Sequence, residues 1–195
     1  MKQNIYLLVF DGFADWEPAY ALCELRRSGK FEIVTVGFSR ESITSMAGLK
    51  ITPDLALKDI QTDNAALLML PGGDMWQEKS QPGVESLLRS FHDKDIPVAA
   101  ICAATLEIAR AGLTRNTRHT SNRLSYLKST LPEYHDESSY IDELAVCDHK
   151  IVTASGLGGV DFAREIFRLL DIYSEKDLLT WYEMFKHGLM PASTT

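Results

Sequence analysis

Cys102 is the residue of this sequence best placed to act as a nucleophile. It lies where an apolar segment, residues 98–101, changes abruptly into a segment with helical spacing, and small residues such as Ala103 surround it. A nucleophile on such a sharp strand-to-helix turn needs small neighbours. The free N–H groups and the dipole of a helix N-terminus would lower the pKa of the thiol and favour the thiolate. The alternative is a structural cysteine in the core.

Gly72 and Gly73 follow Pro71 at the end of another apolar segment, residues 65–70. Glycines permit positive φ and a close approach of the backbone. They can therefore bring a backbone N–H to the cysteine sulfur, and with the N–H of Ala103 such a group would form an oxyanion site. Taken alone, the Pro-Gly-Gly run is better explained as an ordinary turn.

Glu17 is the third candidate, because it lies among the apolar side chains of Phe13, Trp16 and Pro18. Burial in such surroundings would raise the pKa of its carboxyl group. A protonated carboxyl can donate a hydrogen bond to a thiolate or take part in proton transfer. The alternative is an acidic residue in the first turn of a helix, where it interacts favourably with the dipole.

The segments that would position these residues alternate between strand and helix patterns. Strands are expected at 5–10, 31–36, 65–70, 97–102, 118–121, 144–146 and 151–153, and helices at 16–27, 84–92, 105–111, 124–130, 162–170 and 177–185. Residues 42–52 are expected to form a hairpin off the main sheet. The alternation predicts βαβ units, and therefore a mostly parallel sheet with helices on both faces. Ligands of such sheets bind beyond the carboxyl ends of the strands, where the candidate residues would meet.

The length and composition indicate one α/β domain over residues 1–195. A net charge of −7 argues against nucleic acid as a partner. Three scattered cysteines argue for a reducing compartment. With no signal peptide and no long apolar stretch, we expect a cytoplasmic protein without membrane contact. The histidines lack ligand spacing, so we expect no metal, and we expect no cofactor.

The candidate residues belong to a longer series of motifs. These are Phe10-Asp11-Gly12 with Glu17, Leu70-Pro71-Gly72-Gly73, Ala99-Ala100-Ile101-Cys102-Ala103, Thr120-Ser121 and Ile151-Val152-Thr153-Ala154-Ser155-Gly156. Their order and spacing resemble the ThiJ/PfpI family of the class I glutamine amidotransferase-like superfamily. The resemblance covers a core over about residues 4–171 and leaves a C-terminal helical extension over about 172–190. The resemblance implies a flavodoxin-like three-layer sandwich with a nucleophile elbow at Cys102. It also implies a hydrogen bond between Glu17 and Cys102, an oxyanion site from the backbone of Gly73 and Ala103, and a homodimer.

Two positions depart from the pattern of that family. Protease-like members place a histidine directly after the cysteine or nearby in the elbow, where this chain has Ala103. Other members have an aromatic residue or a histidine where this chain has Asn122. Asn122 cannot take a proton, but it can orient a carbonyl or amide group of a substrate. His119 lies an odd number of positions from Asn122, so on a strand it would point to the opposite face, as a core or surface residue.

Without a histidine base, a thiolate assisted by Glu17 is the expected reactive group. Addition to an aldehyde, a 2-oxoaldehyde, an isocyanide or a peroxide needs less base assistance than peptide hydrolysis. We therefore predict a hydrolase-like or glyoxalase-like enzyme acting on a small electrophilic substrate, with peptidase activity disfavoured. The alternative is a non-catalytic stress-response protein that senses oxidants through Cys102. Glutamine amidotransfer is disfavoured, because residues 150–195 contain no His-x-Glu spacing.

Overall fold

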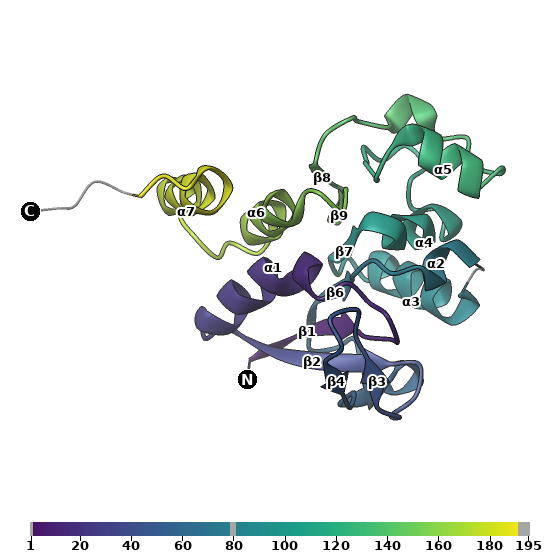
Figure 1. The fold of residues 1–195 in the computed structure, drawn as a ribbon, viewed down its shortest axis with the longest axis horizontal. Helices are drawn as coiled ribbons and strands as arrows, with labels where there is room; N and C mark the ends of the chain where they lie inside the picture. The colour runs from purple at the N-terminus through teal and green to yellow at the C-terminus, as the bar shows by residue number, and fades with distance from the viewer. Residues whose placement is uncertain (1, 79–80, 191–195) are drawn as a thin grey trace, which may run out of the picture.

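A seven-stranded sheet forms the centre of the molecule (Figure 1). The structure, a computed structural model, describes residues 2–78 and 81–190, so both ends of the predicted 1–195 domain lie outside the described residues. The strands are β1 (Gln3–Leu8), β2 (Phe31–Gly37), β5 (Leu55–Ala56), β6 (Ala65–Leu70), β7 (Val98–Ile101), β8 (Ala145–Asp148) and β9 (Ile151–Ala154). Their order is β5-β2-β1-β6-β7-β9-β8. All neighbours are parallel except β8, which pairs antiparallel to β9 at one edge.

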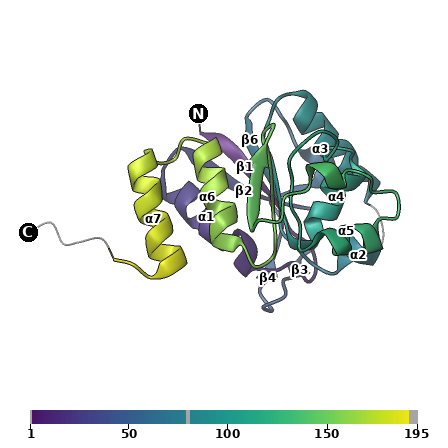
Figure 2. The ribbon, with the colours of Figure 1, turned by 90° about the horizontal axis from the view of Figure 1, so that it is seen from above.

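Helices cover both faces of this sheet. They are α1 (Trp16–Arg27), α2 (Met75–Glu78), α3 (Pro82–Asp93), α4 (Thr105–Arg110), α5 (Leu124–Thr130), α6 (Gly159–Leu169) and α7 (Glu175–His187), with 3₁₀ turns at Leu57–Asp59, Cys102–Ala104 and Glu137–Ser139. Figure 2 shows α1 and α6 on one face with α7 outside them, and α2 to α5 on the other face. The predicted flavodoxin-like three-layer arrangement is confirmed.

The central strands are apolar along their whole length because both of their faces are covered. All six residues of β6 and all four of β7 are buried. Apolar side chains from helices on both faces, such as Leu25, Leu88 and Phe162, are fully buried in the same core. The core therefore fixes β1, β6, β7 and β9 side by side, with their carboxyl ends at one edge.

One predicted strand is wrong. Residues 118–121 form no strand, and His119 makes only a single isolated bridge to Tyr140. The backbone N–H of Thr120 donates to the side-chain oxygen of Thr153 on β9 (2.8 Å) rather than to a backbone carbonyl. The segment runs beside the sheet without joining its ladder of backbone hydrogen bonds. Two short elements, β5 and α2, were not predicted from the sequence patterns.

The predicted hairpin over residues 42–52 is confirmed as a separate two-stranded sheet of β3 (Ile43–Thr44) and β4 (Lys50–Ile51). It is tied to the loop between β1 and α1. Asp11 Oδ1 accepts a hydrogen bond from the Thr44 N–H (2.7 Å), and Asp15 Oδ2 accepts one from the Ala47 N–H (2.8 Å). The hairpin therefore supports the loop that leads into Glu17. Among the described residues, no helix is long and apolar enough to cross a bilayer.

Candidate active site

Cys102 lies on a strained turn directly after β7. Ile101 still has extended backbone angles, whereas Cys102 has φ 60° and begins the 3₁₀ turn that leads into α4. A positive φ at a non-glycine residue costs free energy and persists only where the surrounding structure enforces it. Here the Thr105 hydroxyl donates to the Cys102 carbonyl (2.7 Å) and closes the turn, while Ala103 and Ala104 are buried beneath it. The nucleophile elbow places the thiol beyond the carboxyl end of the sheet.

Glu17 reaches this thiol from the first turn of α1. Its side chain is only 1 % exposed, and its Oε2 accepts a hydrogen bond from the Gly72 N–H at 2.5 Å. Gly72 has to be a glycine, because a β-carbon there would lie 2.7 Å from Cys102 Cβ and 2.7 Å from Glu17 Oε2. Since the Gly72 N–H is engaged with Glu17, it is not free to bind a substrate oxygen.

Asn122 contacts the sulfur from the other side. Its amide nitrogen donates to Cys102 Sγ (3.4 Å), and its Oδ1 accepts from the Gly156 N–H (2.9 Å), which fixes the orientation of the amide. Gly156 also touches the site directly, because a β-carbon there would lie 3.0 Å from Sγ and 3.3 Å from Glu17 Oε1. Sequence reasoning did not single out Gly156 as a site residue. Its place in the site could have been inferred as it was for Gly72, because both are glycines that closely follow a buried strand.

The pKa of the Cys102 thiol is raised to about 11, opposite to the lowering that we expected. Burial is the largest cause, and the charge of the nearby Glu17 carboxylate is the next. Hydrogen bonds from the Asn122 amide and the Ala103 N–H oppose both effects. The expected helix dipole is weak because α4 is short and begins three residues after Cys102. The protonation of this thiol therefore depends on Glu17, Asn122 and Ala103 rather than on a helix.

The pKa of Glu17 is also raised, in the direction expected from the sequence, because burial disfavours its charged form. The hydrogen bond from Gly72 partly offsets this effect. That N–H occupies Oε2, so a proton on the carboxyl group belongs on Oε1, the oxygen on the Cys102 side near Gly156. A protonated Glu17 no longer repels a thiolate and can donate to it. The protonation of Glu17 and that of Cys102 are therefore coupled.

His119 is held away from this pair. It is 1 % exposed, its Nδ1 bonds the Thr117 carbonyl (2.7 Å), and its Nε2 bonds the Tyr134 hydroxyl (2.6 Å). A carbonyl can only accept, so Nδ1 carries the proton and Nε2 accepts from Tyr134. Burial lowers the pKa of His119, which keeps it neutral. It is a core histidine and not a base for Cys102.

Tyr126, on α5, is a residue that no sequence pattern indicated. Its hydroxyl is buried and has no hydrogen-bond partner among the described residues. Burial raises the pKa of this hydroxyl to about 12, with a further contribution from the charge of Cys102. The hydroxyl therefore stays protonated within the electrostatic reach of the sulfur.

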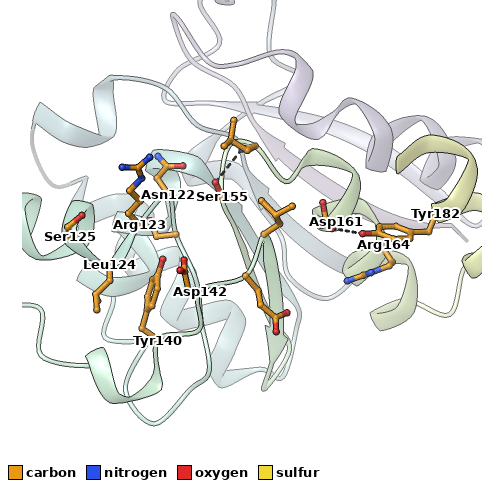
Figure 3. A pocket seen from close by; sticks show the side chains of 14 residues that line it. Asn122, Arg123, Leu124, Ser125, Tyr140, Asp142, Ser155, Asp161, Arg164 and Tyr182 are labelled. Carbon is orange, nitrogen blue, oxygen red and sulfur yellow. Dashed lines mark hydrogen bonds between the residues drawn. The ribbon is translucent and has the colours of Figure 1, made fainter. Parts of the chain in front are cut away.

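A groove of about 810 Å³ lies beside the site (Figure 3). One wall comes from the segment that begins α5 and from the loop before β8, with Asn122, Arg123 and Tyr140. The other comes from α6 and α7, with Arg164 and Tyr182. Asn122 lines this groove and also donates to Cys102 Sγ, whereas Cys102 itself is not among the residues that line it. Within the described part of the chain, no group of three or more His, Cys, Asp or Glu side chains is arranged to hold a metal ion.

Comparison with known proteins agrees with this geometry. The chain is 35 % identical over 192 residues to the uncharacterized protease YoaZ of Bacillus subtilis, covering 94 % of this chain and 91 % of that protein. It superposes with a TM-score of 0.89 on a thiJ/pfpI family protein from Bacillus anthracis (35 % identity, covering 97 % and 92 %). A DJ-1 superfamily protein, Atu0886 from Agrobacterium tumefaciens, gives a TM-score of 0.87 (32 % identity, covering 97 % and 100 %). Residues 3–169 match the DJ-1/PfpI family, and this chain belongs to that family.

Proposed function

We propose that this protein is a cysteine-dependent enzyme that acts on small electrophilic carbonyl compounds, in the manner of a glyoxalase or a hydrolase. One observation carries the proposal. The Cys102 sulfur is a free thiol in direct contact with the Asn122 amide and paired with the buried Glu17 carboxyl group. These are a nucleophile, a hydrogen-bond donor and a proton carrier within one site.

The chemistry follows from the Cys102–Glu17 pair. The sulfur attacks the carbonyl carbon, a bond forms between sulfur and carbon, and the carbonyl π electrons move to oxygen. Glu17 accepts the thiol proton as the sulfur attacks and returns a proton to the new alkoxide. The backbone N–H groups of Gly73 and Ala103, together with Asn122, stabilise the developing negative charge. Asn122 and Gly72 also shape the substrate site.

The names of several relatives support this range of activities. Curated relatives include a protease, a deglycase and a glutathione-independent glyoxalase. Peptide hydrolysis is the least suited of these to this chain, because Ala103 and Asn122 stand where a histidine base would act. Carbonyl addition needs only the proton transfer that Glu17 provides.

Consumption of methylglyoxal tests the proposal. Wild-type protein is expected to consume it, and Cys102→Ala is expected to reduce turnover to the background rate. Activity of Cys102→Ala at the wild-type level would remove Cys102 from the mechanism. Failure of the wild type to consume any 2-oxoaldehyde would overturn the enzymatic proposal.

A second candidate function is a redox sensor in a stress response. The observation in its favour is the Glu17 carboxyl group beside Cys102, which can donate a hydrogen bond to a sulfinate as well as to a thiolate. Mass spectrometry after mild peroxide treatment tests it. Oxidation of Cys102 before Cys23 and Cys147 is expected, and the opposite order would contradict the sensor.

We also propose that the protein is a cytoplasmic homodimer. Exposed apolar side chains on α1 and the β3–β4 hairpin, including Trp16 and Met46, support self-association. Sedimentation equilibrium is expected to give about twice the mass of one 21.8 kDa chain. A species with the mass of a single chain at micromolar concentration would contradict the dimer.

A further inference from the structure

Two buried hydroxyl groups join the elbow at Cys102 to the segment that carries Asn122. Thr105 begins α4 and Ser121 precedes α5, and Figure 1 and Figure 2 both show these two helices next to each other. Both residues are buried, and their hydroxyl oxygens lie 2.7 Å apart. The Thr105 hydroxyl oxygen also lies 2.7 Å from the Cys102 carbonyl oxygen. The pair therefore links the backbone of the reactive residue to the neighbour of the residue that contacts its sulfur.

The direction of this hydrogen-bond chain follows from its last acceptor. A carbonyl oxygen can only accept, so the single O–H of Thr105 is committed to Cys102. In the contact between the two hydroxyls, Ser121 is therefore the donor. The chain runs from Ser121 through Thr105 to the Cys102 carbonyl. Neither hydroxyl can turn away without leaving a buried polar group unpaired, which costs free energy.

Residues 120–122 run beside the sheet without joining its ladder, so side-chain contacts set their position. The Thr120 N–H donates to the Thr153 side chain (2.8 Å), and the Thr120 hydroxyl donates to the Glu143 carbonyl (2.8 Å). These two contacts tie the segment to β9 and to the loop before β8. The Ser121 hydroxyl supplies the contact with the elbow.

Asn122 comes directly after Ser121, and its amide makes two hydrogen bonds. The bond that Oδ1 accepts from the Gly156 N–H (2.9 Å) fixes the orientation of the amide. The bond that its nitrogen donates to Cys102 Sγ (3.4 Å) requires the right separation between this backbone and the elbow. Hydrogen bonds weaken steeply as their geometry departs from the ideal. The contact of Ser121 with Thr105 is the direct link that holds this separation.

We propose that Ser121 and Thr105 are positioning residues for the Cys102 sulfur, because the chain of their hydroxyls holds Asn122 where its amide can donate to the sulfur. They act through Asn122 and through the Cys102 backbone, not on a substrate. The inference concerns the sulfur that the proposed function uses, but it describes the free protein and requires no turnover.

Alkylation of Cys102 by iodoacetamide tests the inference. The Asn122 amide favours the thiolate, whereas burial and the Glu17 carboxylate, the charged group that acts on the sulfur, oppose it. At about pH 8.5, below the thiol pKa of about 11, the alkylation rate is proportional to the small thiolate fraction. Asn122→Ala is expected to lower this rate by about twofold to tenfold, and Ser121→Ala by about twofold or more. Labelling of the exposed Cys23 in the same sample is the internal reference.

A double variant distinguishes positioning from a general loss of packing. If Ser121 acts through Asn122, then removing the amide leaves nothing for its hydroxyl to position. Ser121→Ala combined with Asn122→Ala is therefore expected to react at the rate of Asn122→Ala alone. Two independent effects would multiply instead, and that result would overturn the inference.

Conservative variants and a matched threonine separate positioning from stability. Ser121→Thr and Thr105→Ser keep the hydroxyls and should keep the wild-type rate, whereas Thr105→Val should react as slowly as Ser121→Ala. Thr114→Val is the control, because Thr114 is as buried as Thr105 and its hydroxyl donates to Asp136 (2.6 Å) instead of to the elbow. It should lose stability in urea unfolding as Thr105→Val does, but keep the alkylation rate.

The outcomes separate this inference from the proposed function. A wild-type alkylation rate in Ser121→Ala or in Thr105→Val overturns the positioning role, as does an equal slowing in Thr114→Val. The two substitutions break the same hydrogen bond from its two ends, so either one that folds decides the question. Methylglyoxal turnover is measured in parallel. Slowed alkylation in a protein that consumes no aldehyde retains the positioning role and removes only the enzyme, whereas turnover with unchanged alkylation removes only the positioning role.

Discussion

The reactivity of Cys102 depends on where one proton lies. With Glu17 ionised, its charge and the burial of the sulfur hold the pKa of the thiol at about 11. With the proton on Glu17, the repulsion disappears and the carboxyl group becomes a hydrogen-bond donor. With the shared proton on the sulfur, the thiol is neutral and Glu17 is ionised; the thiolate forms when that proton moves to Glu17.

Glu17→Gln tests this coupling. The amide oxygen can still accept from Gly72, but the negative charge is gone, so the thiol pKa is expected to fall from about 11 by at least ~1. The measurement is the pH dependence of Cys102 alkylation by iodoacetamide. Turnover is expected to drop by ~100-fold or more, because the amide cannot carry the proton.

Glu24→Gln is the matched control for that experiment. Glu24 is another buried carboxylate on α1, but it bonds Tyr173 and Arg27, away from the thiol. Neither the alkylation profile nor turnover should change in this variant. A faster alkylation in Glu24→Gln, or an unchanged thiol pKa in Glu17→Gln, would show that the carboxylate beside the sulfur does not control it.

At the scale of elements, the elbow stores strain in the backbone at Cys102. A left-handed conformation costs about 1–2 kcal/mol for a residue with a β-carbon and almost nothing for glycine. Cys102→Gly is therefore expected to be about 1 kcal/mol more stable than Cys102→Ala, as measured by urea unfolding. Equal stability of the two variants would mean that the turn relaxes once the thiol is removed.

The loop after β6 is held just as tightly. In Gly72→Ala the new β-carbon meets Cys102 Cβ and Glu17 Oε2 at 2.7 Å, so we expect a loss of about 1–3 kcal/mol of stability and of most activity. Gly159→Ala is the control, because the nearest atom to its β-carbon is 3.8 Å away and the residue begins α6. Gly159→Ala should retain the stability and the activity of the wild type. A tolerated Gly72→Ala would contradict the close packing of this loop.

The elements could be predicted because their patterns are strong. α1, β6 and α5 have the bounds predicted from the sequence, since buried runs and amphipathic spacing mark them clearly. The strand predicted at residues 118–121 is absent for a physical reason. A β-branched and polar segment can run beside a sheet and bond to a side chain, Thr153, instead of joining the ladder. Local sequence does not distinguish a segment that joins the sheet from one that only runs beside it.

The site could be predicted only in part, for a similar reason. The proximity of Cys102, Glu17 and Gly72 follows from three strand ends at one edge of a parallel sheet. The direction of the thiol pKa does not follow, because it depends on how deeply Glu17 and Cys102 are buried together. The contact of Gly156 with the sulfur likewise requires the order of β7 and β9, which no local motif specifies.

At the scale of the whole molecule, a buried carboxylate on α6 and aromatic contacts attach α7 to the rest of the chain. Asp161 accepts hydrogen bonds from both Tyr182 and Lys186, and Trp181 packs against Phe167 at 4.8 Å between ring centroids. This attachment fixes the wall of the groove that α7 contributes. Loss of the charged donor leaves a carboxylate that is only partly satisfied.

Lys186→Met is expected to destabilise the protein by about 1–3 kcal/mol, measured by urea unfolding. Lys176→Met, at an exposed position on the same helix, should change stability by less than about 0.5 kcal/mol. Equal effects of the two substitutions would mean that the contact between Lys186 and Asp161 contributes nothing to the docking of α7.

The order of the strands also matters while the chain is being synthesised. β7 lies between β6 and β9, yet β9 leaves the ribosome long after β7 does. Until then one edge of β7 is open, with unpaired backbone groups next to Cys102, and Gly156 is not there to cover the sulfur. Chains that stop before β9 should therefore aggregate and present a thiol without its partners. Pairing of β9 with β7 closes that edge and brings Gly156 against the Cys102 sulfur.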